Sequence, residues 1–178
     1  MISTKIVGVM LAGLLSLQAI AQTPYPLYET LPDTEAKKVL KGFITKAQLS
    51  EDPDFAWYGE TLKYFKPNKE AVAAIAEKAY DYQILLFLGT WCPDSHQIVP
   101  KYISTLEAAE FPDHRMVIIA LDRQKTGHGN LHRPLNIINV PTIMVMKDGL
   151  EIGRIVEFGN GERADVQLAA LFAKPLPK

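Results

Sequence analysis

Four apolar stretches of strand length stand out between residues 84 and 156. The first, Ile84–Leu88, is unbroken, which is typical of a strand covered on both faces. Three more follow, at Met116–Leu121, Thr142–Met146 and about Ile152–Val156. The last two are separated by Lys147-Asp148-Gly149, whose Asp-Gly pair favours a tight turn between antiparallel strands. The pattern therefore predicts four strands, of which the last two form a hairpin.

Apolar residues at helical spacing predict three helices around these strands. The first begins after Asn68, a residue type that caps helices. Its apolar positions recur at i, i+3, i+4 and i+7, at Val72, Ile75, Ala76 and Ala79. A second helix is expected from about Pro93 to Ala109, and a closing helix over Glu162–Phe172. Because strand–helix–strand connections imply parallel pairing, the order predicts an α/β fold with a central mixed sheet flanked by helices.

Residues 22–66 precede this pattern and form an extension to the domain expected over 67–178. One helical face is predicted here after a cap at Asp33 or Thr34, although Gly42 is a poor helix former. Its apolar members are Ala36, Leu40, Phe43, Ile44 and Ala47. A segment of about 45 residues is short for an independent domain, so we expect it to pack on the domain that follows. The aromatic residues that follow the predicted helical face within this segment fit such a docking surface: Phe55, Trp57, Tyr58, Tyr64 and Phe65.

The first 21 residues have the pattern of an export signal. Lys5 precedes a nearly continuous apolar stretch over Ile6–Leu17, and Ala19-Ile20-Ala21 matches the small-x-small cleavage pattern. The apolar stretch is shorter than the roughly 20 residues that a membrane-spanning helix needs. The sequence therefore predicts a signal peptide over residues 1–21, and an exported protein with no stable membrane insertion after cleavage.

Composition excludes several classes of function. The 178 residues are 48% hydrophobic and carry a net charge of −1. This argues for a buried core and against a broad electrostatic grip on nucleic acid. The one cysteine, Cys92, excludes an intrachain disulfide and a cysteine-only metal cluster. His128 and His132 are four residues apart, but two ligands make a poor metal site, so we expect a solvated loop there, with no metal and no cofactor.

The segment Trp91-Cys92-Pro93-Asp94-Ser95 lies where the first predicted strand passes into a helix. This places Cys92 beside a helix N-terminus, where unpaired backbone N–H groups and the helix dipole stabilise a thiolate. Ser95 is close enough in sequence to donate a hydrogen bond to the sulfur. His96 would add a favourable charge if protonated, whereas Asp94 opposes ionisation of the thiol. The sequence therefore predicts a candidate catalytic pair, Cys92 and Ser95, tuned by these two neighbours.

Five elements, in order and at matching spacings, resemble the pattern of the thioredoxin family. They are the strand that leads into the Trp91–Ser95 turn, Pro100, Val140-Pro141-Thr142, Lys147-Asp148-Gly149 and Gly159. The resemblance covers about residues 67–174 and implies a thioredoxin-like fold in which a cis-proline loop at Pro141 faces the thiol. It also implies a substrate surface made by Trp91, Pro93, Val140 and Pro141. Export and the added N-terminal segment look most similar to secreted bacterial members, which implies a periplasmic location.

Three departures from the family pattern remove its two-thiol chemistry. Ser95 stands where the resolving cysteine would lie, and Leu86 and Ile118 replace a buried Asp and Lys that assist proton transfer in the family. Two hypotheses remain. In one, Cys92 is a single nucleophile that forms mixed disulfides with protein disulfides or small thiols, and an external thiol or protein recycles it. In the other, the fold is a redox-inactive module that binds peptides or proteins. An engineered Cys→Ser trap at position 95 fits less well, because the other two losses accompany it.

Overall fold

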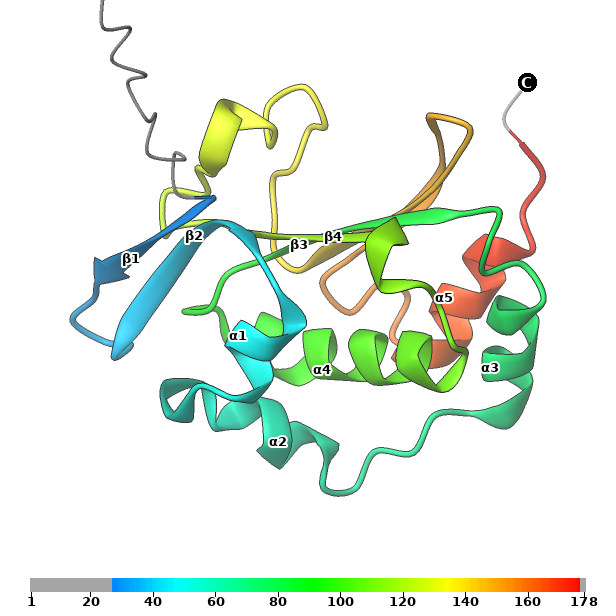
Figure 1. Ribbon diagram of the computed structural model, residues 1–178, viewed down its shortest axis with the longest axis horizontal. Coiled ribbons are helices and arrows are strands. Elements are labelled where there is room, and N and C mark those ends of the chain that lie inside the picture. The colour runs from blue at the N-terminus through cyan, green and yellow to red at the C-terminus, as the bar shows by residue number, and fades with distance from the viewer. Residues whose placement is uncertain (1–26, 177–178) are drawn as a thin grey trace, which may run out of the picture.

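The computed structural model describes residues 27–176 and contains one six-stranded mixed sheet (Figure 1). The predicted signal peptide, residues 1–21, lies outside the described residues. The strands are β1 (Tyr28–Pro32), β2 (Lys38–Ile44), β3 (Gln83–Leu88), β4 (Met116–Ala120), β5 (Thr142–Lys147) and β6 (Leu150–Val156). Their order across the sheet is β1-β2-β4-β3-β5-β6.

The central pairing follows the sequence prediction. Strands β3 and β4 are parallel, with Leu86 opposite Ile118, and β5 and β6 continue the sheet in antiparallel pairs. The turn between β5 and β6 has positive φ at both Asp148 and Gly149, 50° and 79°. This is the backbone conformation that an Asp-Gly hairpin turn requires. The expected α/β fold with a mixed sheet is confirmed.

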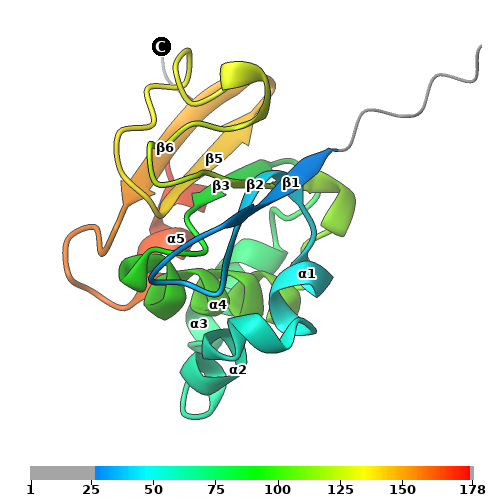
Figure 2. The ribbon, with the colours of Figure 1, turned by 90° about the vertical axis from the view of Figure 1, so that its left-hand side faces the viewer.

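Five α-helices lie on one face of the sheet (Figure 2). They are α1 (Lys46–Ser50), α2 (Trp57–Leu62), α3 (Lys69–Ala76), α4 (Pro93–Ala108) and α5 (Ala164–Phe172). The three predicted helices, α3, α4 and α5, are confirmed, and the Asn68 side chain caps α3 by accepting a hydrogen bond from Ala71 N at 2.8 Å. Alternate residues of β3, Ile84, Leu86 and Leu88, are fully buried beneath these helices. Burial on this scale is the main source of stability for the fold.

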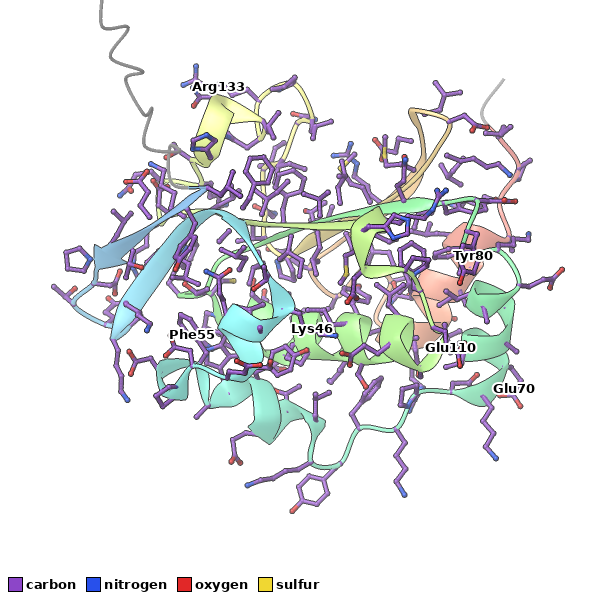
Figure 3. The ribbon with its side chains drawn as sticks, viewed as in Figure 1. Lys46, Phe55, Glu70, Tyr80, Glu110 and Arg133 are labelled. Atoms are coloured by element: carbon purple, nitrogen blue, oxygen red, sulfur yellow. The ribbon has the colours of Figure 1, made fainter. Side chains whose placement is uncertain are left out.

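In the described part of the chain, the opposite face of the sheet is covered by the segment between β4 and β5, which contains a short 3-10 helix, His128–Asn130, and no α-helix. Phe87 and Ile119 point to this side and pack with Ile137 and Val140 from the segment that leads into β5. Figure 3 shows Arg133 of this segment on the other side of the sheet from Lys46, which begins α1. Cys92 belongs to this second, smaller cluster. No helix within residues 27–176 is long and apolar enough to cross a membrane.

The described part of the N-terminal extension contributes two strands to the sheet. The prediction of a helix over this segment is wrong, because residues 38–44 form β2. This strand pairs antiparallel with both β1 and β4. Leu40 and Ile44 face the helices, whereas Phe43 faces the other cluster. Gly42 has φ of 120°, and a Cβ there would lie 2.4 Å from Leu27 O, so the pairing with β1 requires glycine. The extension therefore packs on the domain, as expected, but as part of its sheet.

Candidate functional site

Cys92 is the residue that caps the N-terminus of α4. Its backbone is extended, with φ −91° and ψ 121°, and its carbonyl accepts the first helical hydrogen bond, from His96 N at 3.1 Å. Its own N–H donates to Gly89 O at 2.9 Å, which closes the turn after β3. Pro93 takes the first helical position, where a missing N–H removes no helical bond. The sequence prediction that Cys92 lies at this helix terminus is confirmed.

The Cys92 sulfur faces the loop that precedes β5. Its S–H donates to Val140 O at 3.3 Å, and the peptide bond between Val140 and Pro141 is cis. Cys92 is 8% exposed and packs among the apolar residues of the smaller cluster, with half-buried Trp91 beside it. The sulfur therefore lies at a helix terminus with its hydrogen donated to a carbonyl.

Ser95 is fully buried below the turn. Its hydroxyl oxygen accepts a hydrogen bond from Gly89 N at 3.2 Å, which fixes the turn against the first turn of α4. Between Ser95 and Cys92 the described residues show no hydrogen bond, so donation to a thiolate stays a prediction. Asp94 is half-buried in the first turn of α4, and Pro93 is exposed.

His96 is held in a neutral form by its surroundings. Its Nε2 lies 2.8 Å from Thr90 O, a carbonyl, so the ring nitrogen is the donor in this bond. The ring stacks on Trp57 of α2 with centroids 4.3 Å apart and planes 13° from parallel. Burial lowers the pKa of His96 below its usual 6.5, although the hydrogen bond to Thr90 opposes this shift. His96 therefore adds no full positive charge near Cys92 at neutral pH.

Trp91 is fixed from two directions. Its indole Nε1 donates to Leu121 O at 2.9 Å, and the Arg123 guanidinium lies 5.3 Å from the ring centroid. Arg123 in turn forms a two-point ion pair with Asp33, at 2.6 and 2.9 Å, and contacts Glu35 at 3.0 Å. The loop between β1 and β2 is thereby connected to the turn that carries the thiol.

Two side chains around the site were not found from the sequence: Thr61 and Thr90. Thr61 Oγ1 donates to His96 O at 2.9 Å, and Thr90 Oγ1 accepts from Leu40 N at 3.0 Å. One signal for Thr61 was present in the sequence. Pro100 has no N–H, so the carbonyl four residues before it, that of His96, needs a donor from elsewhere in the fold.

The two histidines of the segment after β4 do not lie in a solvated loop as expected. His132 is 9% exposed, and its Nδ1 is buried with no hydrogen-bond partner among residues 27–176. The ring of His128 meets Phe43 edge-on at 5.9 Å. Within residues 27–176, no three side chains of the His, Cys, Asp or Glu type are grouped so as to hold a metal ion.

No protein-family model and no curated protein sequence matches the chain. One similar solved structure is a protein of unknown function from Pseudomonas aeruginosa, with a TM-score of 0.44 and 14% identity over 65% of this chain and 79% of that one. Another is an HIV epitope scaffold, with a TM-score of 0.44 and 15% identity over 66% and 76%. Thioredoxin O2 from Arabidopsis thaliana, in its oxidized state, gives 0.37 and 24% identity over 57% and 80%. The strand order, the parallel β3–α4–β4 unit and the closing hairpin and helix of this chain form a thioredoxin-like fold.

Proposed function

We propose that this chain is an exported, periplasmic protein that carries out thiol–disulfide exchange with a single nucleophilic cysteine. The observation that carries the proposal is the position of Cys92, at the N-terminus of α4 with its sulfur 3.3 Å from Val140 O in the cis-proline loop. A helix terminus stabilises the thiolate that exchange requires. Export rests on the signal pattern of residues 1–21.

The reaction proceeds in two exchanges. The Sγ proton first leaves to solvent, which breaks the bond to Val140 O. The thiolate then attacks one sulfur of a disulfide R–S–S–R′. The Cys92–S–S–R bond forms, the original S–S bond breaks, and R′S⁻ leaves with the electron pair. An external thiolate R″S⁻ attacks the R sulfur in turn, giving R–S–S–R″ and regenerating the Cys92 thiolate. Because Ser95 cannot act as a resolving thiol, the second exchange needs this outside partner.

The surface around the sulfur supports an extended substrate. Pro93 is exposed and Trp91 is half-buried beside Cys92, while the backbone of Val140 and Pro141 lies opposite. An extended segment could pair with this backbone as an added strand. Protein disulfides are substrates of this kind. Small disulfides would need access only to the Cys92 sulfur.

The burial of the thiol favours a second candidate function. Cys92 is 8% exposed and its hydrogen is donated to a carbonyl, as in a structural cysteine. In that case the same surface binds peptides or proteins without any disulfide exchange. Cys92 then serves only as an apolar side chain of the smaller cluster.

Whole-protein mass spectrometry after incubation with glutathione disulfide separates the two functions. We expect one glutathione adduct on the native protein, removed by reduced glutathione, and none on Cys92→Ala. The denatured wild-type chain serves as the control that the thiol is intact. A native chain that stays unmodified while the denatured chain reacts would overturn the exchange function and leave the binding module.

A further inference from the structure

The first turn of α4, which carries Cys92 at its start, lacks one helical hydrogen bond. Pro100 lies inside the helix. Since proline has no N–H, the carbonyl of His96 receives no helical hydrogen bond from position 100. This carbonyl is partly buried, so it needs a donor from outside the helix.

The donor comes from α2, in the N-terminal segment. Thr61 Oγ1 donates to His96 O at 2.9 Å and replaces the bond that Pro100 cannot make. One turn earlier in α2, Trp57 stacks on the His96 ring at 4.3 Å. His96 is therefore held at its backbone and at its ring by the same short helix.

Strand β2 holds the turn from the other end. Leu40 N donates to the buried Thr90 Oγ1 at 3.0 Å, two residues before Cys92. The carbonyl of Thr90 accepts from His96 Nε2 at 2.8 Å. The His96 ring thus connects the attachment from α2 with the attachment from β2. Residues of the N-terminal extension therefore hold the turn that carries the thiol from both sides.

We propose that Trp57 and Thr61 are positioning residues for Cys92. They fix the first turn of α4 and, with it, the position of the sulfur opposite Val140 O. Neither residue contacts the reacting atoms. The effect on exchange rests on the proposed function, whereas the effect on the helix turn is independent of it.

Thr61→Val tests the backbone attachment, because it removes the hydroxyl while keeping the side-chain shape. The reporter is the amide of His96, which donates to Cys92 O at 3.1 Å. We expect its hydrogen exchange to rise about fivefold, in line with the loss of one ordinary hydrogen bond. Mixed-disulfide formation with glutathione disulfide at fixed pH should slow by a similar factor.

Thr105→Val is the matched control. Thr105 is fully buried in the same helix and its Oγ1 donates to Lys101 O at 2.7 Å, within α4 and away from the thiol. This variant loses an equivalent hydroxyl, so a rise in His96 amide exchange equal to that of Thr61→Val would show a general loss of stability and overturn the inference.

The ring attachment is tested by Trp57→Ala and its rescue by Trp57→Phe. We expect the alanine variant to raise His96 amide exchange and slow mixed-disulfide formation, and the phenylalanine variant, which can still stack, to restore most of both. Wild-type protection of the His96 amide in both Thr61→Val and Trp57→Ala would overturn the inference. A wild-type chain that forms no mixed disulfide, while Thr61→Val still loosens the His96 amide, would refute the proposed function and support the attachment.

Discussion

Asp165 forms a buried polar junction between two helices, and replacing it by asparagine should be among the more damaging conservative changes in the chain. Its carboxylate is fully buried at the start of α5. Oδ2 accepts from Asn68 N at 2.7 Å and Arg163 Nη2 at 2.6 Å, and Oδ1 accepts from Val166 N at 3.0 Å and Arg163 Nε at 3.1 Å. The Asn68 bond joins the cap of α3 to α5.

The expected cost of Asp165→Asn follows from these bonds. Hydrogen bonds to a charged group contribute roughly 1.5–3 kcal/mol, and neutral ones about 1 kcal/mol. Asparagine keeps one oxygen for Asn68 N but turns an NH₂ group toward the donors of Arg163 or Val166. The Arg163 side chain is 55% exposed, so its ion pair adds little. We expect a loss of about 2–4 kcal/mol in the free energy of unfolding, which lowers Tm by about 5–15 °C.

The stabilisation that the Asp165 carboxylate gives should decrease as the pH falls. Burial raises the pKa of Asp165, but hydrogen bonds from Arg163 and Asn68 outweigh it and hold the pKa below its usual 3.8. Because the folded pKa is below the unfolded one, the stabilisation is fully present above about pH 4 and is lost as the pH falls through the folded value. The gap in stability between wild type and Asp165→Asn should therefore narrow on acidification.

Thermal unfolding followed by circular dichroism between pH 7 and pH 3 measures both the loss of stability and its dependence on pH. Glu60→Gln is the matched control, because it removes an exposed ion pair with Lys63 at 2.6 Å and should cost less than about 0.5 kcal/mol. Equal unfolding temperatures for the two variants at pH 7 would refute the reasoning on the junction. A gap that does not narrow between pH 7 and pH 3 would refute its electrostatic part.

Other substitutions test the site and the sheet. Ser95→Cys should form an intramolecular disulfide with Cys92 on mild oxidation, seen as the loss of both free thiols, and two titratable thiols after oxidation would contradict this. Leu86→Asp places a carboxylate at a fully buried position and should lower the free energy of unfolding in urea by about 3–5 kcal/mol. Gly42→Ala puts a Cβ 2.4 Å from Leu27 O at φ 120° and should cost about 1–3 kcal/mol while β1 amides lose protection from hydrogen exchange.

The sequence predicted best those elements whose signals are local. The apolar run of β3 is unbroken because both of its faces are covered, and Asn68 caps α3 with its own side chain. Asp148 and Gly149 set the hairpin turn through their own backbone preferences. The position of Cys92 at a helix terminus belongs to the same group, since it follows from where a strand ends and a proline begins the helix.

The helix expected near Leu40 failed because its spacing is ambiguous. Leu40 and Ile44 are four residues apart, and positions separated by four share a face of a helix and also share a face of a strand. The choice between the two is made by β4, which pairs with β2 and offers it a place in the sheet. The contacts of His96 with Trp57 and Thr61 were missed for a different reason. Pro100 shows that the His96 carbonyl needs a donor, but no local pattern says which residue supplies it.

The pairing of β2 with β4 also sets an order of assembly. Strand β2 is synthesised before β3 and α4, yet its central partner β4 follows them both. The β1–β2 hairpin can form alone, but two isolated strands are only marginally stable in water, and closing the long loop to β4 costs chain entropy. The contact of Leu40, in β2, with the turn that carries Cys92 is therefore completed late. We expect partly folded chains to present this thiol to alkylating reagents far more openly than the native protein does.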